Sequence, residues 1–255
     1  MSGRGPRTLV RALAALYPEL EEPALLIAAG KVTVDGRVVR NPASMVGPGS
    51  QLHVVASASL RGEAKLRAAL DTFRIPMAGR VALDAGAAAG GFTRVLLEYG
   101  AARVYAVDAG HGQLLGSLRQ EPRVVNLEAT NLADLTPLLV PDLIEVVTLD
   151  LSYLSLAEAV PQLDRLRLDA AADLVALVKP MFELHLAQPP ATSDRAALHR
   201  ALALAVTGIE HAGWTTLATM ESPVLGGRGA FEFLVHARRG PAPPVRGNRG
   251  REDRT

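Results

Sequence analysis

From about residue 63 to residue 236, short apolar runs alternate with segments in which apolar residues recur every three to four positions. Apolar runs between turn residues predict buried strands, and the three-to-four spacing predicts amphipathic helices. The sequence therefore predicts helices at Glu63–Phe73 and about Asp194–His211, and strands near Val81–Asp84, Val104–Asp108, Val124–Leu127, Ile144–Leu149 and Leu174–Val178. Strands that alternate with helices in this way form a doubly wound α/β sheet.

Two further apolar segments close this region, T-T-L-A-T-M-E from Thr215 and F-E-F-L-V-H-A from Phe231. We expect them to form an antiparallel hairpin at one edge of the sheet. The main domain is placed at residues 63–238. The Pro-, Gly- and Arg-rich residues 239–255 offer almost nothing to bury, so we expect them to form a disordered basic tail.

Residues 1–56 have a different pattern and are expected to form a small, separate α+β domain. Two short apolar segments divided by Pro18 and Pro23 predict two short helices. Valines alternate on both sides of Asp35-Gly36, a dipeptide that adopts the positive-φ turn of a β-hairpin. A third strand, Q-L-H-V-V-A, follows. The small residues after it make residues 57–62 a plausible linker into the main domain.

The first strand of the main domain runs into a glycine-rich loop, V-A-L-D-A-G-A-A-A-G-G-F-T from Val81, and a helical pattern follows. Such strand-to-helix turns cradle nucleotide-like cofactors, because glycine lets a ligand approach the backbone and the helix start offers free N–H groups. Asp84 ends the strand, and Gly86 and Gly90 lie in the loop. The alternative interpretation is an ordinary α/β loop with incidental glycines.

The second strand, R-V-Y-A-V-D, ends in Asp108, at the spacing from the first strand where an acid meets ribose hydroxyls in nucleotide-binding βαβ units. We therefore expect a bound adenosine. The loop lacks the G-x-G-x-x-G pattern of dinucleotide folds. Because Asp84 would repel a pyrophosphate but tolerates a cation, S-adenosylmethionine is the expected cofactor.

Composition excludes several classes of chemistry. The 255 residues include no Cys, which rules out disulfides, a thiolate metal site and a cysteine nucleophile. Six scattered His without clustered acids give no metal-ligand spacing, so no metal is expected. The sequence begins without the apolar core of a signal peptide, and no apolar run reaches the ~18 residues of a membrane span. We expect a soluble, cytoplasmic protein.

The net charge is only +1, but it is unevenly distributed: +3 over residues 1–62, −6 over residues 63–236 and +4 from Ala237 onward. Basic terminal segments are typical of nucleic-acid contact, although solvated surface charge explains a charge of this size equally well. Within the N-terminal segment we assign Arg7 and Arg11 to substrate binding.

Three polar residues lie at the carboxyl ends of predicted strands or beside them, where open α/β sheets bind ligands: Asp150, Lys179 and Glu232. Without a cysteine, methylation of pyrimidine C5 through a covalent intermediate is excluded. The chain also has no Asn-Pro-Pro-aromatic stretch that could accept hydrogen bonds from an exocyclic amine, so an amino group is not the expected methyl acceptor. Oxygen or a small molecule remains as the methyl acceptor. Each of these residues could equally be a solvated cap or an ion pair.

A ribose 2′-hydroxyl is a weak nucleophile, so transfer to it benefits from a base. A lysine whose pKa is lowered by burial and by a second cation can be that base, while carboxylates hold it in position. Lys179 is the candidate base and Lys65 the candidate second cation, with Asp150 and Glu232 as the carboxylates. Tyr153, which follows Asp150 closely, is the candidate for stacking on the substrate.

The motifs together resemble those of the TlyA (haemolysin A-like) ribosomal RNA 2′-O-methyltransferases from Arg7 to Ala237. They are L-D-A-G-A-A-A-G-G-F-T, A-V-D-A-G-H-G-Q-L, L-D-L-S-Y-L-S-L, L-V-K-P-M-F-E and S-P-V-L-G-G-R-G-A-F-E-F-L. The resemblance implies a Rossmann-like, class I, FtsJ-like methyltransferase domain preceded by an S4-like RNA-binding domain. It implies a catalytic Lys-Asp-Lys-Glu tetrad at Lys65, Asp150, Lys179 and Glu232, and an S-adenosylmethionine pocket lined by Asp84, Gly86, Gly90, Asp108 and Glu128.

The resemblance also implies that ribosomal RNA or a ribosomal subunit is the partner, but the chain departs from the family at its substrate surface. Where the family has a Ser-Arg pair and further basic residues, this chain has the acidic Glu19, Glu21 and Glu22, which would repel phosphate. We therefore expect an altered RNA target or docking mode. A small-molecule O-methyltransferase and a non-catalytic ribosome-binding or RNA-binding factor remain as alternative functions.

Overall fold

A computed structural model describes residues 5–17, 23–28, 30–54 and 56–240. The chain divides into two compact units, residues 1–62 and 63–255. The acidic stretch at residues 19–22 lies outside the described residues, as does the predicted disordered tail from residue 241 onward. Only the first residues of the predicted tail are described, and Arg239 among them is the last residue of the final strand.

Before α3, the described residues of the N-terminal unit form two helices and five short strands: β1 (Arg7–Thr8), α1 (Leu9–Leu16), α2 (Pro23–Ala28), β2 (Val32–Val34), β3 (Arg37–Val38), β4 (Met45–Val46) and β5 (Leu52–Val54). The predicted hairpin is confirmed: β2 pairs with β3 across Asp35 and Gly36, which have φ angles of 51° and 78°. β5 pairs with the other side of β2, and β1 pairs with β4. Apolar side chains of both helices and three strands form its core: Leu9, Leu13, Ile27, Val32, Val46 and Leu52.

The segment predicted as a linker is helical. Helix α3 spans Ala56–Phe73, so residues 57–62 belong to its first turns, and the helix predicted at Glu63–Phe73 is longer at its N-terminal end. Ser and Ala carry only a small penalty in a helix, and no proline interrupts the segment. The start predicted for the helix, Glu63, is therefore wrong, because small residues are compatible with either a helix or a loop, whereas the linker role of residues 57–62 stays a prediction.

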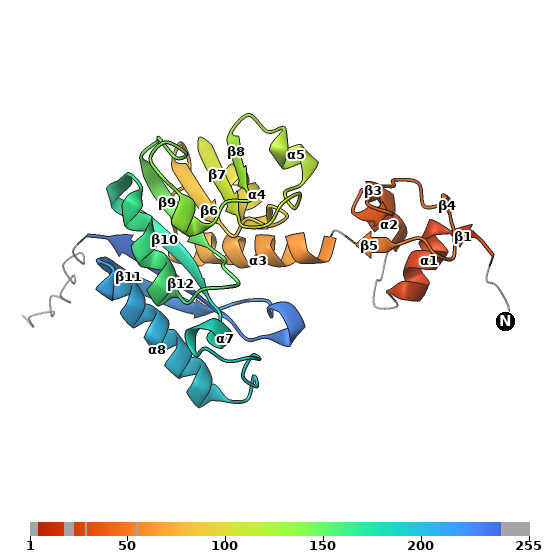
Figure 1. Ribbon diagram of the computed structural model, residues 1–255. Helices are drawn as coiled ribbons and strands as arrows, with labels where there is room; N and C mark the ends of the chain where they lie inside the picture. Colours follow the sequence, from red (N-terminus) through yellow and green to blue (C-terminus); the bar gives the residue numbers. More distant parts are fainter. Residues whose placement is uncertain (1–4, 18–22, 29, 55, 241–255) are drawn as a thin grey trace, which may run out of the picture. The chain divides into compact units, whose positions relative to one another are not determined.

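The main unit is built on a seven-stranded sheet with strand order β11-β12-β10-β9-β6-β7-β8 (Figure 1). The five parallel strands are β6 (Val81–Ala85), β7 (Arg103–Asp108), β8 (Val124–Glu128), β9 (Ile144–Leu149) and β10 (Leu168–Val178). Strands β11 (Trp214–Glu221) and β12 (Phe233–Arg239) pair antiparallel and extend the sheet beyond β10. The predicted α/β sheet and its antiparallel edge hairpin are confirmed.

Helical segments cover both faces of this sheet. On one face α3, α4 (Gly91–Glu98) and α5 (Gly116–Arg119) pack against side chains such as Ala82, Val104 and Val175. On the other face, side chains such as Leu83, Val107 and Val147 lie under η1 (Leu132–Asp134), α6 (Leu156–Ala159), η2 (Val160–Arg165) and α8 (Arg195–His211). Alternate residues of a strand point to opposite faces, so each buried strand supplies both cores. The unit is a three-layer α/β/α domain.

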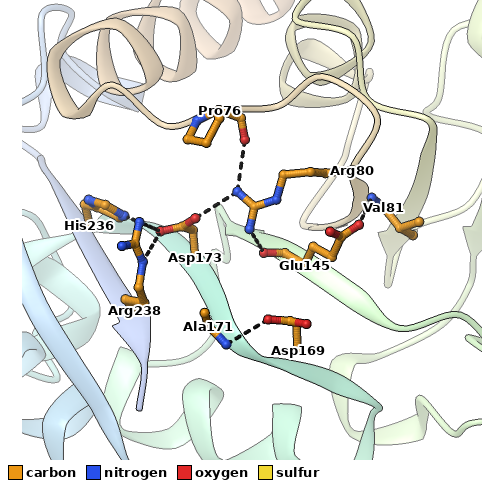
Figure 2. Close-up of polar contacts among 9 residues, drawn as sticks. All are labelled: Pro76, Arg80, Val81, Glu145, Asp169, Ala171, Asp173, His236 and Arg238. Atoms are coloured by element: carbon orange, nitrogen blue, oxygen red, sulfur yellow. Dashed lines mark hydrogen bonds and ion pairs between the residues drawn. The ribbon is translucent and has the colours of Figure 1, made fainter. Parts of the chain in front are cut away.

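A buried ion cluster fastens the end of the sheet opposite to the strand termini that carry the predicted site (Figure 2). Asp173, 2% exposed, accepts hydrogen bonds from Arg80 at 2.8 Å and Arg238 at 2.8 Å, and lies 2.8 Å from His236 Nε2. Although burial raises its pKa, the hydrogen bonds from these three partners hold the pKa of the Asp173 carboxyl at about 2. Because Arg80 belongs to the segment that follows α3, the cluster ties that segment to β10 and β12.

Strand order fixes where a ligand can bind. The chain enters the sheet centrally at β6, builds outward through β7 and β8, and then returns to the other side of β6 with β9. Neighbouring loops therefore diverge between β6 and β9, and open α/β sheets bind ligands outside the carboxyl ends of the strands at such a point. The residues after Asp84, Asp108, Leu149 and Val178 all meet at this edge.

Candidate active site

A first cavity of about 230 Å³ opens at the carboxyl ends of β6, β7 and β9. Its walls come from the loops that follow these strands and β8, and its lining includes Gly86, Ala88, Asp108, Gln113, Thr130 and Asp150. Of the five predicted cofactor residues, Gly86 and Asp108 line this cavity, whereas Asp84, Gly90 and Glu128 do not. The last three act on the loops around it.

Gly86 lets two strand ends come together. It has φ +88°, and a Cβ atom at this position would lie 2.3 Å from the backbone carbonyl oxygen of Asp150. A side chain would have to displace backbone, which has no flexible end to move aside. The backbone N–H of Asp150 in turn donates to the carbonyl oxygen of Ala85 at 2.9 Å. Gly86 is therefore required for the close contact between the β6 loop and the end of β9.

Asp84 is fully buried beneath the glycine-rich loop and does not face the cavity. Its carboxylate accepts hydrogen bonds from Thr93 Oγ1 at 2.6 Å and Thr148 Oγ1 at 2.8 Å. Burial raises the pKa of Asp84 to about 6, the two threonine hydroxyls act in the opposite direction, and the nearby Asp150 charge raises it further. This carboxyl joins β6 to β9 and to α4, which places the loop without requiring direct contact with a ligand.

Asp108 holds the loops on either side of the cavity through its two carboxylate oxygens. Oδ2 accepts the backbone N–H of Ala88 at 2.8 Å, and Oδ1 accepts the backbone N–H of Gly110 at 2.7 Å. Each carboxylate oxygen has a second lone pair for a ligand hydroxyl. Asp108 thus both organises the cavity and lines it.

Glu128 acts one layer further out. It accepts the backbone N–H groups of Gln113 at 2.5 Å and Leu114 at 2.9 Å, and its other oxygen forms a 2.7 Å ion pair with Arg119. Burial raises the pKa of Glu128. Hydrogen bonds from Asn126 and from these two amides, together with the charge of Arg119, outweigh burial and lower the pKa to about 2. Glu128 therefore secures the loop that carries Gln113, a residue of the cavity wall.

Gly90 has a packing role. It is the residue before α4, with φ +92°, and a Cβ atom there would lie 2.2 Å from Cδ1 of Leu118 and 2.8 Å from Cδ1 of Leu114. The glycine therefore allows the start of α4 to pack directly against the α5 region. It does not line the first cavity.

A second cavity, of about 430 Å³, lies beside the ends of β10 and β12. Its polar lining consists of Ser152, Lys179 and Glu232, and its apolar lining includes Met181, Phe182 and Pro189. Ser152 lines the first cavity as well, so the two cavities meet at this residue. A group bound in one cavity can therefore approach a group bound in the other.

The Lys179 amine lies at this junction. Its Nζ atom is 2.6 Å from Oδ1 of Asp150 and donates to Oγ of Ser152 at 2.8 Å. Lys179 directly follows β10 and precedes Pro180, the first residue of α7 (Pro180–Glu183). The strand and the proline restrict the backbone on both sides of the lysine, and the contacts with Asp150 and Ser152 hold its Nζ atom in place.

Lys65 and Glu232 form a second, more deeply buried pair. Nζ of Lys65 on α3 is 2.5 Å from Oε2 of Glu232, and the side chains are 7% and 5% exposed. Gly226 covers the carboxylate, because a Cβ atom there would lie 2.0 Å from Oε1 of Glu232. The four predicted catalytic residues thus form two ion pairs, and Glu232 and Lys179 line the same cavity.

Tyr153 lines the first cavity and is 47% exposed, so its ring is available to a large ligand. Arg7 lies on β1 and Arg11 on α1, where its side chain is exposed. Both belong to the N-terminal unit and line neither cavity.

Sequence reasoning missed the residues that connect the predicted ones. Ser152, which bridges both cavities, stands in the L-D-L-S-Y motif beside Asp150, and this proximity was the available signal. Thr93 and Gly226 stand in the glycine-rich loop motif and in the closing motif, so their proximity to Asp84 and Glu232 was again the available signal. Thr148 gave no signal, because its partner Asp84 lies on another strand, 64 residues away in the sequence.

Metal sites and membrane-spanning helices are both absent from the described residues. No group of three or more His, Cys, Asp or Glu residues in this part of the chain is arranged to hold a metal ion. Among the helices of the same described ranges, none is both long enough and apolar enough to cross a membrane.

Comparisons with known proteins assign both units. Residues 59–239 match the FtsJ-like methyltransferase family, and residues 24–52 match the S4 domain. The chain is 42% identical over 225 residues to the 16S/23S rRNA (cytidine-2′-O)-methyltransferase TlyA of Mycobacterium tuberculosis, covering 86% of this chain and 84% of that one. It is 33% identical to Hemolysin A of Brachyspira hyodysenteriae, covering 83% and 90%.

Solved structures agree with these matches. A protein described as a hemolysin from Streptococcus thermophilus aligns with a TM-score of 0.69 and 29% identity over 94% of this chain and 91% of that one. An S-adenosylmethionine-dependent methyltransferase from Mesorhizobium loti aligns with a TM-score of 0.50 and 17% identity, over 68% of this chain and 96% of that one. The second likeness concerns the fold alone.

Proposed function

Because the chain belongs to the FtsJ-like methyltransferase family and to the TlyA proteins within it, we propose that it transfers a methyl group from S-adenosylmethionine to a ribose 2′-hydroxyl of ribosomal RNA. One observation of the site carries the proposal: the Lys179 amine, held by Asp150 and Ser152, lies where the two cavities meet. A methyl donor in the first cavity and a hydroxyl in the second would meet beside a potential base.

The first cavity suits S-adenosylmethionine by the chemistry of its lining. Asp108 can accept hydrogen bonds from the ribose hydroxyls, and Val107 and Leu132 offer apolar surface to a purine ring. Asp108 and Asp150 make the lining acidic, which favours a cation and disfavours a pyrophosphate. When bound, S-adenosylmethionine supplies a methyl group on a positively charged sulfur, and transfer leaves a neutral thioether.

The second cavity is proposed to receive the nucleoside that is methylated. In this assignment the 2′-hydroxyl oxygen forms the new bond to the methyl carbon as the bond from that carbon to sulfur breaks, and Lys179 Nζ, as a neutral amine, takes the proton that this hydroxyl loses. Asp150 and Ser152 orient the lysine, since both contact its Nζ atom. Lys65 and Glu232 form the second lysine–acid pair of the site, and Tyr153 offers a ring for stacking.

The N-terminal unit is proposed to bind ribosomal RNA, with Arg7 and Arg11 among the contacts to phosphate. An S4 domain match and a basic charge over residues 1–62 support this role. Because the TlyA relative named above acts on ribosomal RNA, we take a ribosomal subunit as the substrate.

Radiolabel transfer tests the proposal. The full chain is incubated with S-adenosylmethionine labelled in the methyl group and with purified small or large ribosomal subunits, at low and moderate salt, and the RNA is then digested to nucleosides. Label in a 2′-O-methylated nucleoside is the expected result, with a yield that falls as salt rises. Bound cofactor without any labelled RNA would overturn the proposal and direct attention to small acceptors or to a non-catalytic role.

A further inference from the structure

The short loop of residues 150–156, here called the divider loop, separates the two cavities. Asp150, Ser152 and Tyr153 line the first cavity, and Ser152 also lines the second. The loop begins at the end of β9 and runs into α6 at Leu156. Any shift of this loop would move the Lys179 contacts and the boundary between the cavities together.

Helix α7 holds the divider loop at both ends. Lys179, the residue before α7, contacts Asp150 at 2.6 Å and Ser152 at 2.8 Å. Glu183, the last residue of α7, accepts the backbone N–H of Leu156 through Oε1 at 3.0 Å. Because α7 is only one turn long, Lys179 and Glu183 are joined directly: the N–H of Glu183 donates to the carbonyl oxygen of Lys179 at 3.2 Å.

Glu183 is an unusual residue for this place, since carboxyl groups are rarely buried unless they are paired or used. It is 5% exposed, and the described residues give it no ion-pair partner. Its bond to Leu156 satisfies an N–H group at the start of α6, where no preceding turn can accept it. Neighbouring Glu158 serves Ser155 instead, accepting its N–H at 3.0 Å and its hydroxyl at 2.7 Å.

We propose that Glu183 is a positioning residue for methyl transfer, which fixes the far end of the divider loop so that Lys179 and Ser152 stay aligned between the two cavities. The effect of Glu183 on catalysis rests on the proposed function, whereas the contact between Glu183 and Leu156 does not depend on that function. Glu183 touches neither cavity, so it acts through the loop and through Lys179.

The protonation behaviour of Glu183 fits an acceptor role rather than a charge role. Burial raises its pKa to about 7, opposed by the hydrogen bond from Leu156 and reinforced by the negative charge of Glu158. Both the acid and the carboxylate present an oxygen that can accept the Leu156 N–H. A neutral amide at this position should therefore preserve the function, and an apolar side chain should not.

The test compares Glu183→Gln with Glu183→Met in the full chain. Hydrogen–deuterium exchange of the peptide that contains residues 152–158 reports the loop directly, and kcat and KM for S-adenosylmethionine and for ribosomal subunits report the consequence. We expect Glu183→Met to raise the exchange rate of this peptide and to lower kcat by about tenfold or more, a change of about 1.4 kcal/mol in the barrier. Glu183→Gln should stay within about threefold of the unmodified chain in both measurements, since it loses no acceptor.

Asp173→Asn is the matched control. It changes another buried acid of the main unit, in the cluster that joins Arg80 to β10 and β12, and so lowers stability without touching the divider loop. It should leave kcat and the exchange of residues 152–158 unchanged. If this control lowers kcat as much as Glu183→Met, the loss reflects stability and the proposal is wrong.

Two further outcomes would overturn the inference. Unchanged exchange and unchanged kcat in Glu183→Met would show that the contact does not fix the loop. Equal losses in Glu183→Gln and Glu183→Met would show that charge, not the acceptor oxygen, matters. If the unmodified chain transfers no methyl group to RNA, the proposed function fails, but the exchange measurement still tests whether Glu183 fixes the loop. Failure of the proposed function and failure of this inference can therefore be told apart.

Discussion

Lys65 and Glu232, separated by 167 positions in the sequence, form an ion pair 2.5 Å long in which both side chains are less than a tenth exposed. Burial of two charges is tolerated because each is the partner of the other. Removal of one partner leaves an uncompensated charge in a poorly solvated site. The pair therefore links the helix that opens the main unit, α3, to the segment that leads into β12.

We predict that Lys65→Met and Glu232→Gln each lower the free energy of unfolding by about 3–5 kcal/mol, the cost of one unpaired buried charge. The double variant should recover part of this loss while remaining inactive in methyl transfer. Urea denaturation followed by the fluorescence of Trp214, the single and buried tryptophan of the chain, measures unfolding of the main unit. Additive losses in the double variant would contradict the prediction, because paired residues must couple.

For Lys179→Ala we predict a loss of transfer of at least about 100-fold, with the dissociation constant for S-adenosylmethionine changed by no more than a few-fold, because a general base acts on the acceptor. Lys179→Arg should be equally inactive, since a guanidinium keeps its proton. Radiolabel transfer and isothermal titration calorimetry measure the two quantities. Restored transfer in Lys179→Arg would assign the residue to charge stabilisation instead.

Gly86→Ala should weaken the binding of S-adenosylmethionine by about tenfold or more, since the added Cβ would meet the Asp150 carbonyl oxygen and separate the two strand ends. Gly79→Ala is the matched control, because Gly79 has a similar positive φ of 77° but a Cβ atom there would meet nothing within 4 Å. Calorimetry of both variants separates the steric effect from backbone strain. Equal affinities in the two variants would rule out the steric explanation.

Gly226→Ala should displace the Glu232 carboxylate and reduce transfer, because the added Cβ would lie 2.0 Å from Oε1. We expect a loss of about 10-fold to 100-fold in kcat, since a misplacement of about 1 Å can have an effect of this size. Gly116→Ala is the control and should remain active, because a Cβ atom there would meet nothing within 4 Å and Gly116 lines neither cavity. Full activity in Gly226→Ala would mean that Glu232 can move without consequence.

The buried carboxyl group of Asp84 should make the free energy of unfolding depend on pH. Burial raises its pKa to about 6 in the folded protein, against 3.8 as the ordinary value, so the folded state binds the proton more tightly. Its contribution to stability is therefore complete below pH 3.8 and is lost as the pH rises through 6. The free energy of unfolding of Asp84→Asn, relative to that of the unmodified chain, should rise by up to about 3 kcal/mol as the pH increases from 3.8 to 6 and should rise no further above pH 6.

Urea denaturation of Asp84→Asn and of the unmodified chain at a series of pH values measures this difference. Using Trp214 fluorescence restricts the readout to the main unit, in which Asp84 lies. Parallel stability curves from pH 4 to pH 7 would show that the Asp84 carboxyl is not held in the protonated form at the lower end of this range.

The sequence by itself determined the order and kind of the main elements. Apolar runs such as Val81–Asp84 and Ile144–Leu149, each between turn residues, favour a buried sheet, and the turn at Asp35-Gly36 has a local cause in its positive φ angles. Acids and lysines at strand ends also showed where chemistry would gather, because parallel strands all end at one edge. The helical state of residues 57–62 was missed, since small polar residues specify no single local structure.

Only the tertiary structure decided how those residues pair and which of them face a cavity. Asp84, Gly90 and Glu128 carry the same sequence signals as Gly86 and Asp108, yet they support the loops while the other two line the cavity. The difference arises from partners distant in sequence, such as Thr148 and Leu118, which no local pattern reveals. Local residue types fix strands, turns and their ends, whereas burial and partner choice depend on long-range packing, which exists only once the sheet has formed.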